Sequence, residues 1–250
     1  MSLRALLETS PSQFCLAFNI KNVDAVFPGF SLGDFAILYG SPKILYLSLL
    51  LCVRAQLPYQ LGGLRTNAVF VDGGNTFRLY DASYIAQLHE LYPKDALERI
   101  FISRAFTAYQ MTSIVFDRLQ TAVTKYNSKL VIISDIAGLY LDKDVPKNEA
   151  EEVFNQLTVY LSNFARTRRV IVVATFFPHS SSKLNVFFRE MASRRANVVA
   201  SIRESKHSHQ FVLEKHPVFN LRKTCFPSEN LSLTKFMGEW KWEKPLNHIE

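Results

Sequence analysis

A short polar stretch separates two apolar segments near the start of the chain, in the sequence FAILYGSPKILYLSLLL (residues 35–51). The apolar residues before it predict a buried strand, and those after it predict a helix. A lysine and the free N–H groups at a helix N-terminus are the groups that bind phosphate in nucleotide-binding loops. The stretch therefore indicates a phosphate site, with Gly40, Ser41 and Lys43 as its candidate residues.

The same stretch departs from the phosphate-loop pattern G-x-x-x-x-G-K-[ST]. Counted back from Lys43, the two glycine positions hold Ile37 and Pro42, and the position of the magnesium-binding hydroxyl holds Ile44. Proline has no N–H to donate, and an isoleucine side chain cannot ligate Mg²⁺. A simple strand-to-helix turn with a solvated lysine therefore remains an alternative to a phosphate site.

Polar residues also follow three later apolar strands, NAVFVDGG (67–74), KLVIISD (129–135) and RVIVVATFF (169–177). In open α/β sheets, ligands bind at the carboxyl ends of the strands, which here carry Asp72, Asp135 and Thr175. The run of apolar residues before Asp135 has the form of a Walker B strand, whose carboxylate holds the magnesium shell. Asp135 is therefore the magnesium-site candidate, although an Asp that only caps a turn would fit the same pattern.

Strand and helix patterns alternate along the chain, which predicts an α/β fold. The apolar strands show no polar alternation, as expected for a mostly parallel twisted sheet flanked by helices on both faces. A late hairpin predicts antiparallel edge strands near the C-terminus. We expect one core domain over residues 1–226 and a tail or edge addition over 227–250. The expected strands are 34–40, 67–74, 99–106, 129–135, 169–177, 197–205 and 209–216, and the expected helices are 43–56, 79–92, 108–126 and 147–166.

Composition narrows the class of protein. The chain has 250 residues, 48% of them hydrophobic, with a formal net charge of +7 that favours a polyanionic partner. Its three cysteines form no C-x-x-C pair, which argues against a zinc site or a disulfide framework. The start of the chain has no signal-peptide pattern, and the most apolar run, residues 44–53, is too short to span a bilayer. We predict a soluble cytoplasmic protein with no membrane partner.

The order of these motifs along the chain resembles that of a known protein family. Lys43, Asp72, Asp135 and Thr175 follow successive strands in the order used by the RecA/RadA recombinases. The chain resembles their RecA-like P-loop NTPase core, in particular that of archaeal RadA paralogues and related KaiC-like proteins. The resemblance covers residues 23–226 and is carried by VDAVFPGFSLGDFAILYGSPK (23–43), VFVDGGNTFRLYDASYIAQ (69–87), RIFISRAFTAYQMTSIVFDRL (99–119) and RRANVVASIRESKHSHQFVLEKHP (194–217).

The resemblance also implies catalytic parts that this sequence lacks. The family's water-positioning Glu corresponds to Gly74, and its γ-phosphate sensor corresponds to Phe176 or Phe177. Phosphoryl transfer depends on positioning and charge, so losing these parts should remove most of the rate. We therefore predict a pseudo-ATPase with a degenerate P-loop, no catalytic residue and no required cofactor. Weak binding of ATP and magnesium stays open at a vestigial nucleotide site of Gly40, Ser41, Lys43 and Asp135.

The region from Arg166 to Lys206 is strongly basic, with nine Lys or Arg and two Asp or Glu. In the family that the chain resembles, the loop after the fourth strand contacts single-stranded DNA, and here that loop is expected over residues 178–195. Phe187 and Phe188 could stack on bases there, or could be core residues of a helix. A solvated basic surface without a nucleic-acid role is the alternative. The candidate DNA contacts are Lys183, Arg189, Arg194 and Arg195.

Two smaller features complete the sequence-based picture. FCLA (14–17) fits the F-x-x-A pattern with which recombinases bind their neighbours, but a first core strand is expected at the same place. Trp240 and Trp242 are candidate anchors for a partner or for packing on the domain edge.

The function implied by the resemblance is that of a non-catalytic RadA paralogue. It would act as an accessory factor in homologous recombination and DNA repair by binding a RadA-type recombinase or another paralogue, with single-stranded DNA as a further candidate partner. One alternative is an ATP-binding enzyme whose site is rearranged or completed by a partner. Another alternative is a KaiC-like regulatory scaffold with no nucleic-acid role.

Overall fold

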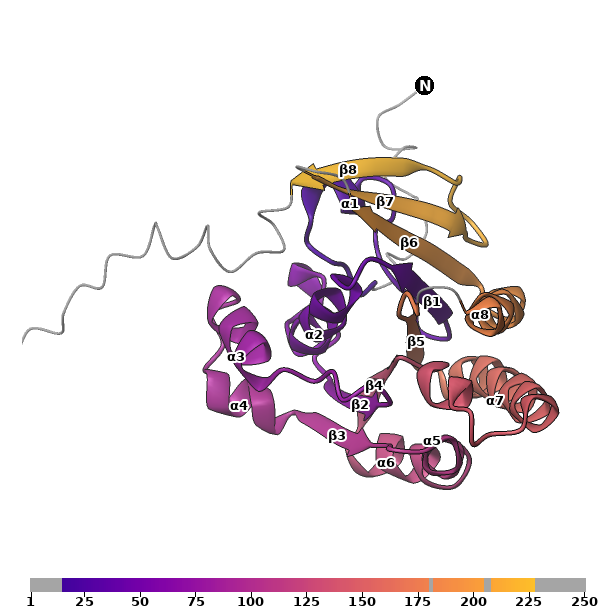
Figure 1. Cartoon of the computed structure of the whole chain (residues 1–250). Helices are drawn as coiled ribbons and strands as arrows, with labels where there is room; N and C mark the ends of the chain where they lie inside the picture. Colours follow the sequence, from indigo (N-terminus) through magenta and orange to yellow (C-terminus); the bar gives the residue numbers. More distant parts are fainter. Residues whose placement is uncertain (1–14, 180–181, 205–207, 228–250) are drawn as a thin grey trace, which may run out of the picture.

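The computed structural model describes residues 15–179, 182–204 and 208–227. The expected α/β fold is confirmed by a single eight-stranded sheet with the strand order β3-β2-β4-β5-β1-β6-β7-β8 (Figure 1). The first five strands along the chain and β6 pair in parallel, and β6, β7 and β8 pair antiparallel. The strands are β1 (Phe35–Gly40), β2 (Asn67–Asp72), β3 (Ile100–Arg104), β4 (Ser128–Ser134), β5 (Ile171–Phe176), β6 (Val198–Glu204), β7 (Ser208–Lys215) and β8 (Lys223–Pro227).

Helices cover both faces of the parallel part of the sheet (Figure 1). On one face lie α2, α3 and α4, and on the other lie α5, α6, α7 and α8. The α-helices are α1 (Lys21–Asp24), α2 (Ile44–Arg54), α3 (Leu79–Leu88), α4 (Pro93–Glu98), α5 (Ala108–Ser113), α6 (Leu119–Lys125), α7 (Lys147–Arg168) and α8 (Lys183–Arg195). Short 3₁₀ turns occupy η2 (Tyr59–Leu61) and η4 (Gly138–Leu141), and a π-helical turn, η3 (Ile114–Arg118), joins α5 to α6.

The uninterrupted apolar strands create two cores, because side chains alternate between the faces of a sheet. In β1, Leu38 packs into the core under α2, whereas Ile37 packs into the core under α7. Ile132 and Ile133 of β4 divide between the two cores in the same way. The parallel strands are therefore apolar on both sides, and their carboxyl ends share one edge of the sheet.

The structure corrects several expected boundaries. The expected helix 79–92 ends at Leu88, and Pro93 starts α4, consistent with proline being favoured in the first turn of a helix. The expected first strand near residues 14–17 is reduced to one bridge between Leu16 and Phe30. The segment expected as a loop over 178–195 is mostly α8, and β8 was not expected at all. The expected tail, with Trp240 and Trp242, lies outside the described residues apart from Pro227.

Candidate functional site

The turn between β1 and α2 is the predicted phosphate site, and it contains only three residues, Ser41, Pro42 and Lys43. Ser41 donates its N–H to the Ile202 oxygen at 2.8 Å, and Lys43 donates its N–H to the Ser41 Oγ at 3.1 Å. The N–H groups of Ile44 and Leu45 bond to the oxygens of Ser41 and Pro42. Since Pro42 has no N–H, every backbone donor from residue 41 to residue 45 already has an acceptor in the chain.

Side chains from β6 and β7 lie beside this turn. The Ser41 hydroxyl donates to the Glu204 carboxylate at the end of β6. His209 of β7 is 4% exposed, and neither of its ring nitrogens has a hydrogen-bond partner. Burial lowers the pKa of His209, with the nearby Lys43 charge acting in the same direction and Glu204 opposing it. The β6–β7 hairpin therefore supplies the side chains that lie against the β1–α2 turn.

Asp135 lies one residue beyond β4, in a left-handed conformation with φ of 50°. Its N–H donates to the Thr175 Oγ1 at 3.0 Å, and both of its carboxylate oxygens lie 3.1 Å from the His179 Nε2. Burial raises the pKa of the Asp135 carboxyl, and the His179 contact partly offsets this. The Asp135 carboxylate is therefore already in contact with His179, in the loop that follows β5.

The predicted nucleotide-site residues come from neighbouring parts of the same sheet edge but are not joined. Gly40, Ser41 and Lys43 lie at the end of β1, Asp135 lies at the end of β4, and β5 runs between those strands. Lys43 and Asp135 form no ion pair with each other. Within the described residues, no group of three or more His, Cys, Asp or Glu side chains could hold a metal ion.

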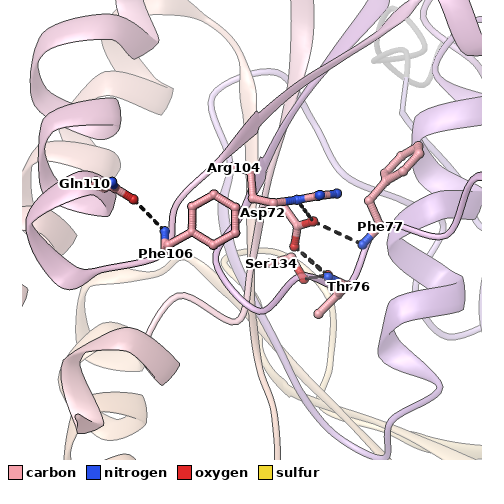
Figure 2. Close-up of polar contacts among 7 residues, drawn as sticks. All are labelled: Asp72, Thr76, Phe77, Arg104, Phe106, Gln110 and Ser134. Carbon is pink, nitrogen blue, oxygen red and sulfur yellow. Dashed lines mark hydrogen bonds and ion pairs between the residues drawn. The ribbon is translucent and has the colours of Figure 1, made fainter. Parts of the chain in front are cut away.

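The most highly connected carboxylate at this edge is Asp72, the last residue of β2 (Figure 2). It is fully buried and accepts hydrogen bonds from the Thr76 N–H at 2.7 Å, the Thr76 hydroxyl at 3.1 Å and the Phe77 N–H at 3.2 Å. Arg104 Nε lies 3.3 Å from it as an ion pair. Thr76 also bonds to the Ser134 hydroxyl at 2.5 Å, which ties the loop after β2 to the end of β4.

Sequence reasoning found Asp72 but missed Thr76, Ser134 and Arg104. The only early signal was that Thr76 and Arg104 lie in segments that carried the family resemblance. Gly74 lies in the same loop, and a Cβ built on it would be 2.7 Å from Thr76 Cγ2 and 3.1 Å from Asp135 Cβ. The position that matches the family's water-positioning Glu therefore has no room for a side chain without movement of its neighbours.

The four predicted DNA contacts lie along α8 and are not gathered at one point. Lys183 is the first residue of α8, and Arg189 stacks over the Tyr39 ring at 4.4 Å. Arg194 and Arg195 are exposed in the last turn, at the opposite end of the helix. In the same helix, Phe188 is fully buried, whereas Phe187 is 43% exposed.

The FCLA segment is built into the fold as far as it is described. Leu16 is fully buried and exchanges backbone hydrogen bonds with Phe30. Ala17 donates its N–H to the Gly62 oxygen and accepts a 2.6 Å hydrogen bond from Arg54 Nε. Phe14 lies outside the described residues. The alternative of a core segment is therefore supported for residues 16 and 17.

The outermost parallel strand, β3, leaves an apolar surface exposed. β3 pairs only with β2 in the described sheet, and its Ile102 is 43% exposed. Phe106 and Tyr109, which follow the strand, are 67% and 61% exposed. Gln110 fixes the turn by accepting the Phe106 N–H at 2.8 Å (Figure 2). We call Ile102, Phe106 and Tyr109 the β3-edge surface.

The strand order and the placement of these motifs are those of a RecA-like core. The Rad51 family model matches residues 21–188, which is more than half of the chain. The chain therefore belongs to the Rad51 family. It is also 31% identical over 129 residues to the DNA repair and recombination protein RadA of Aeropyrum pernix.

That aligned segment covers 50% of this chain and 40% of RadA, so the chain spans about two fifths of the length of that relative. A family-level link to recombination and repair follows from these matches. No helix among the described residues is long and apolar enough to cross a membrane.

Proposed function

We propose that this chain is a non-catalytic member of the Rad51 family that acts as an accessory factor in recombinational repair. It would bind a RadA-type recombinase or another paralogue instead of hydrolysing ATP. The observation that carries the proposal is the three-residue turn between β1 and α2, whose backbone donors are all used within the chain.

Phosphate loops work by presenting free backbone N–H groups to the phosphates. Here a phosphate would have to displace the hydrogen bonds of Ser41 and Lys43 and approach the Glu204 carboxylate. The residues present therefore do not fit a triphosphate. The lack of space at Gly74 and the contact of Asp135 with His179 also argue against a positioned water and a magnesium shell.

Calorimetric titration with ATP and magnesium tests this part directly. We expect no measurable heat of binding. In a separate phosphate-release assay, we expect the background rate, and the same rate in Lys43→Ala. Saturable binding that Lys43→Ala abolishes would contradict the proposal. That result would favour the second candidate, a weak ATPase completed by a partner, for which the unpartnered His209 ring beside Lys43 is the supporting observation.

For the partner, the support comes from the β3-edge surface. An edge strand presents unpaired N–H and C=O groups, and exposed aromatic side chains beside it are typical of interface anchors. We expect the chain to capture a RadA-type recombinase in a pull-down assay, and Phe106→Ala/Tyr109→Ala to weaken capture by about 10-fold or more. Val186→Ala/Phe187→Ala, which removes an exposed apolar pair from α8, is the matched control. Capture that is equal in both variants would exclude this surface.

Single-stranded DNA remains a proposed second partner through Lys183 and Arg189, the first two of the four candidate cations along α8 after the loop that follows β5. Salt-dependent binding of a labelled single strand that Lys183→Gln/Arg189→Gln weakens would support it. A chain that binds neither DNA nor a recombinase would favour the KaiC-like scaffold instead. The cytoplasmic location stays a prediction.

A further inference from the structure

The C-terminal ends of α7 and α8 meet at the edge of the sheet where β1, β5 and β6 begin. α7 ends at Arg168 and leads into β5, and α8 ends at Arg195 and leads into β6. The Ser162 hydroxyl of α7 bonds to the Arg195 oxygen of α8 at 3.2 Å. This edge is opposite the one that holds the β1–α2 turn, because the strands are parallel.

Six basic side chains collect there, and we call them the α7/α8 basic surface. A Cβ built on Gly33, just before β1, would lie 3.9 Å from both the Arg166 Cα and the Arg169 Nη1. Lys215, from β7, donates to the Ser193 and Arg194 oxygens at 3.1 Å, so it joins the same group from the other side. The members are Arg166, Arg168, Arg169, Arg194, Arg195 and Lys215, and all six are exposed.

None of these six cations forms an ion pair with a described carboxylate. Two carboxylates in neighbouring elements, those of Asp34 and Glu214, are engaged elsewhere. Asp34 is 7% exposed and accepts hydrogen bonds from Asn197 and the Ser31 N–H. Glu214 accepts hydrogen bonds from Tyr39 and Ser201. Glu190 is the remaining acidic side chain on α8, in the turn before Arg194.

Cations in the last turn of a helix also stabilise its dipole, which is the alternative explanation for the arginines. Two helix C-termini carry a combined partial charge of about −1, which six cations exceed several-fold. Lys215 bonds to C-terminal carbonyls of α8 and Arg169 is the C-cap residue of α7, so both also stabilise a helix end. The excess of six positive charges over the two helix ends is therefore the part that helix stabilisation leaves unexplained. The surplus positive charge is left for a partner.

We infer that the α7/α8 basic surface binds the phosphate backbone of duplex nucleic acid without reading its sequence. Phosphate contacts of exposed Arg and Lys supply non-specific affinity of this kind. No large apolar side chain is exposed on the last turn of α7 or α8 as described, whereas binding of a single strand relies on stacking aromatics. A hollow of about 460 Å³ lies beside Arg194 and Lys215, but Glu190 and Glu214 also line it, so the phosphate contacts are assigned to the exposed cations and not to the hollow.

This inference is independent of the proposed accessory role and of the ATP site. It also assigns Arg194 and Arg195 to duplex binding at the α7/α8 basic surface, and not to single-strand binding at the loop that follows β5. The Rad51 family match ends at residue 188, before Arg194, Arg195 and Lys215. Nucleotide and recombinase binding should therefore be unchanged in variants of this surface, which makes failure of the two proposals distinguishable.

The test is fluorescence anisotropy of the full chain with a labelled duplex and with a single strand of the same length, between about 50 and 200 mM salt. The variants are Arg166→Gln/Arg168→Gln and Arg194→Gln/Arg195→Gln. Each should weaken duplex binding by about 10-fold and lower the salt slope by about one to two. Lys94→Gln/Lys143→Gln removes two exposed charges elsewhere and is the matched control.

Weakening by the control equal to that of the arginine variants would show a general charge effect and overturn the site. Absence of duplex binding at low salt would overturn it as well. Tighter binding of the single strand, lost in the same variants, would overturn the duplex assignment. Circular dichroism of each variant checks that the fold is retained.

Discussion

The two ends of the parallel strands form two opposite edges of the central sheet, and the polar groups at these two edges are used in opposite ways. At the edge where β1, β2 and β4 end, the polar groups bond to one another, as Ser41 does to Glu204 and Asp72 does to Thr76. At the edge where β1, β5 and β6 begin, six exposed cations have no carboxylate partner among the described residues. In an open α/β sheet the first edge is the expected ligand site. By the inference above, the second edge is the one whose charges are available to a partner, although His209 at the first edge also keeps two ring nitrogens without a hydrogen bond.

The prediction with the largest expected effect removes Asp72, the carboxylate that organises the first edge, where the polar groups bond to one another. Asp72→Ala leaves the donors of Thr76, Phe77 and Arg104 without their acceptor. Breaking a buried charged network of this kind costs about 3–5 kcal/mol. Urea unfolding should show a loss of that size. Asp95→Ala, on exposed α4, is the control and should change the free energy of unfolding by less than about 0.5 kcal/mol.

A second test concerns how tightly the β1–α2 turn is held. Gly40 has φ of 110°, and a Cβ on it would lie 2.2 Å from the Ile202 oxygen. Gly40→Ala should lower the free energy of unfolding by about 2–3 kcal/mol, because strain and a backbone clash add. Gly33 has a similar φ of 105°, but its nearest neighbour would be 3.9 Å away. Gly33→Ala therefore measures the strain alone, and an equal loss in both variants would contradict the clash.

The sequence predicted the apolar strands and their parallel arrangement, because uninterrupted Val and Ile runs between helices have few other solutions. It predicted a loop over 178–195 and kept a helix with Phe187 and Phe188 in the core as the alternative, which the structure confirms for Phe188 only. Leu184 and Met191, at helical spacing from Phe188, pack against the same core. The loop was expected because the family that the chain resembles has one after its fourth strand. The spacing was the available signal.

The site could be predicted only in part, for a physical reason. A motif shows which residue ends a strand but not which side chain meets it from elsewhere. Asp135 and His179 are 44 residues apart, and Ser41 and Glu204 are 163 residues apart. Those contacts depend on strand order and register, which local patterns do not specify. The motif at residues 40–43 therefore gave a degenerate phosphate loop as the prediction, with a simple turn as its alternative.

A third test uses a carboxylate that is buried but incompletely bonded, unlike those of the first edge. The Asp24 Oδ1 has no hydrogen-bond partner, and burial raises the pKa of Asp24 to about 6, opposed by the Arg54 charge. Because the folded pKa is raised, the stabilisation is fully present below the unfolded value of 3.8 and is lost as pH rises through about 6. Asp24→Asn should remove this loss.

The free energy of unfolding of Asp24→Asn, relative to the unmodified chain, should therefore rise by about 1 kcal/mol between about pH 4 and pH 7, after allowance for partial exposure. Urea unfolding across this pH range measures it. A difference that does not change with pH would show that Asp24 titrates normally.

The prediction with the smallest expected effect concerns the second edge, which carries the α7/α8 basic surface. Replacing Arg194 and Arg195 with Gln removes a favourable interaction with the α8 dipole but also relieves repulsion within the basic surface. These terms oppose each other, so the free energy of unfolding should change by less than about 0.5 kcal/mol. Thermal unfolding at low and high salt tests this, because salt screens both terms and should reduce any net change. A loss above about 1 kcal/mol that salt does not reduce would assign these arginines to the fold, and would remove the argument that this edge keeps its charges for a partner.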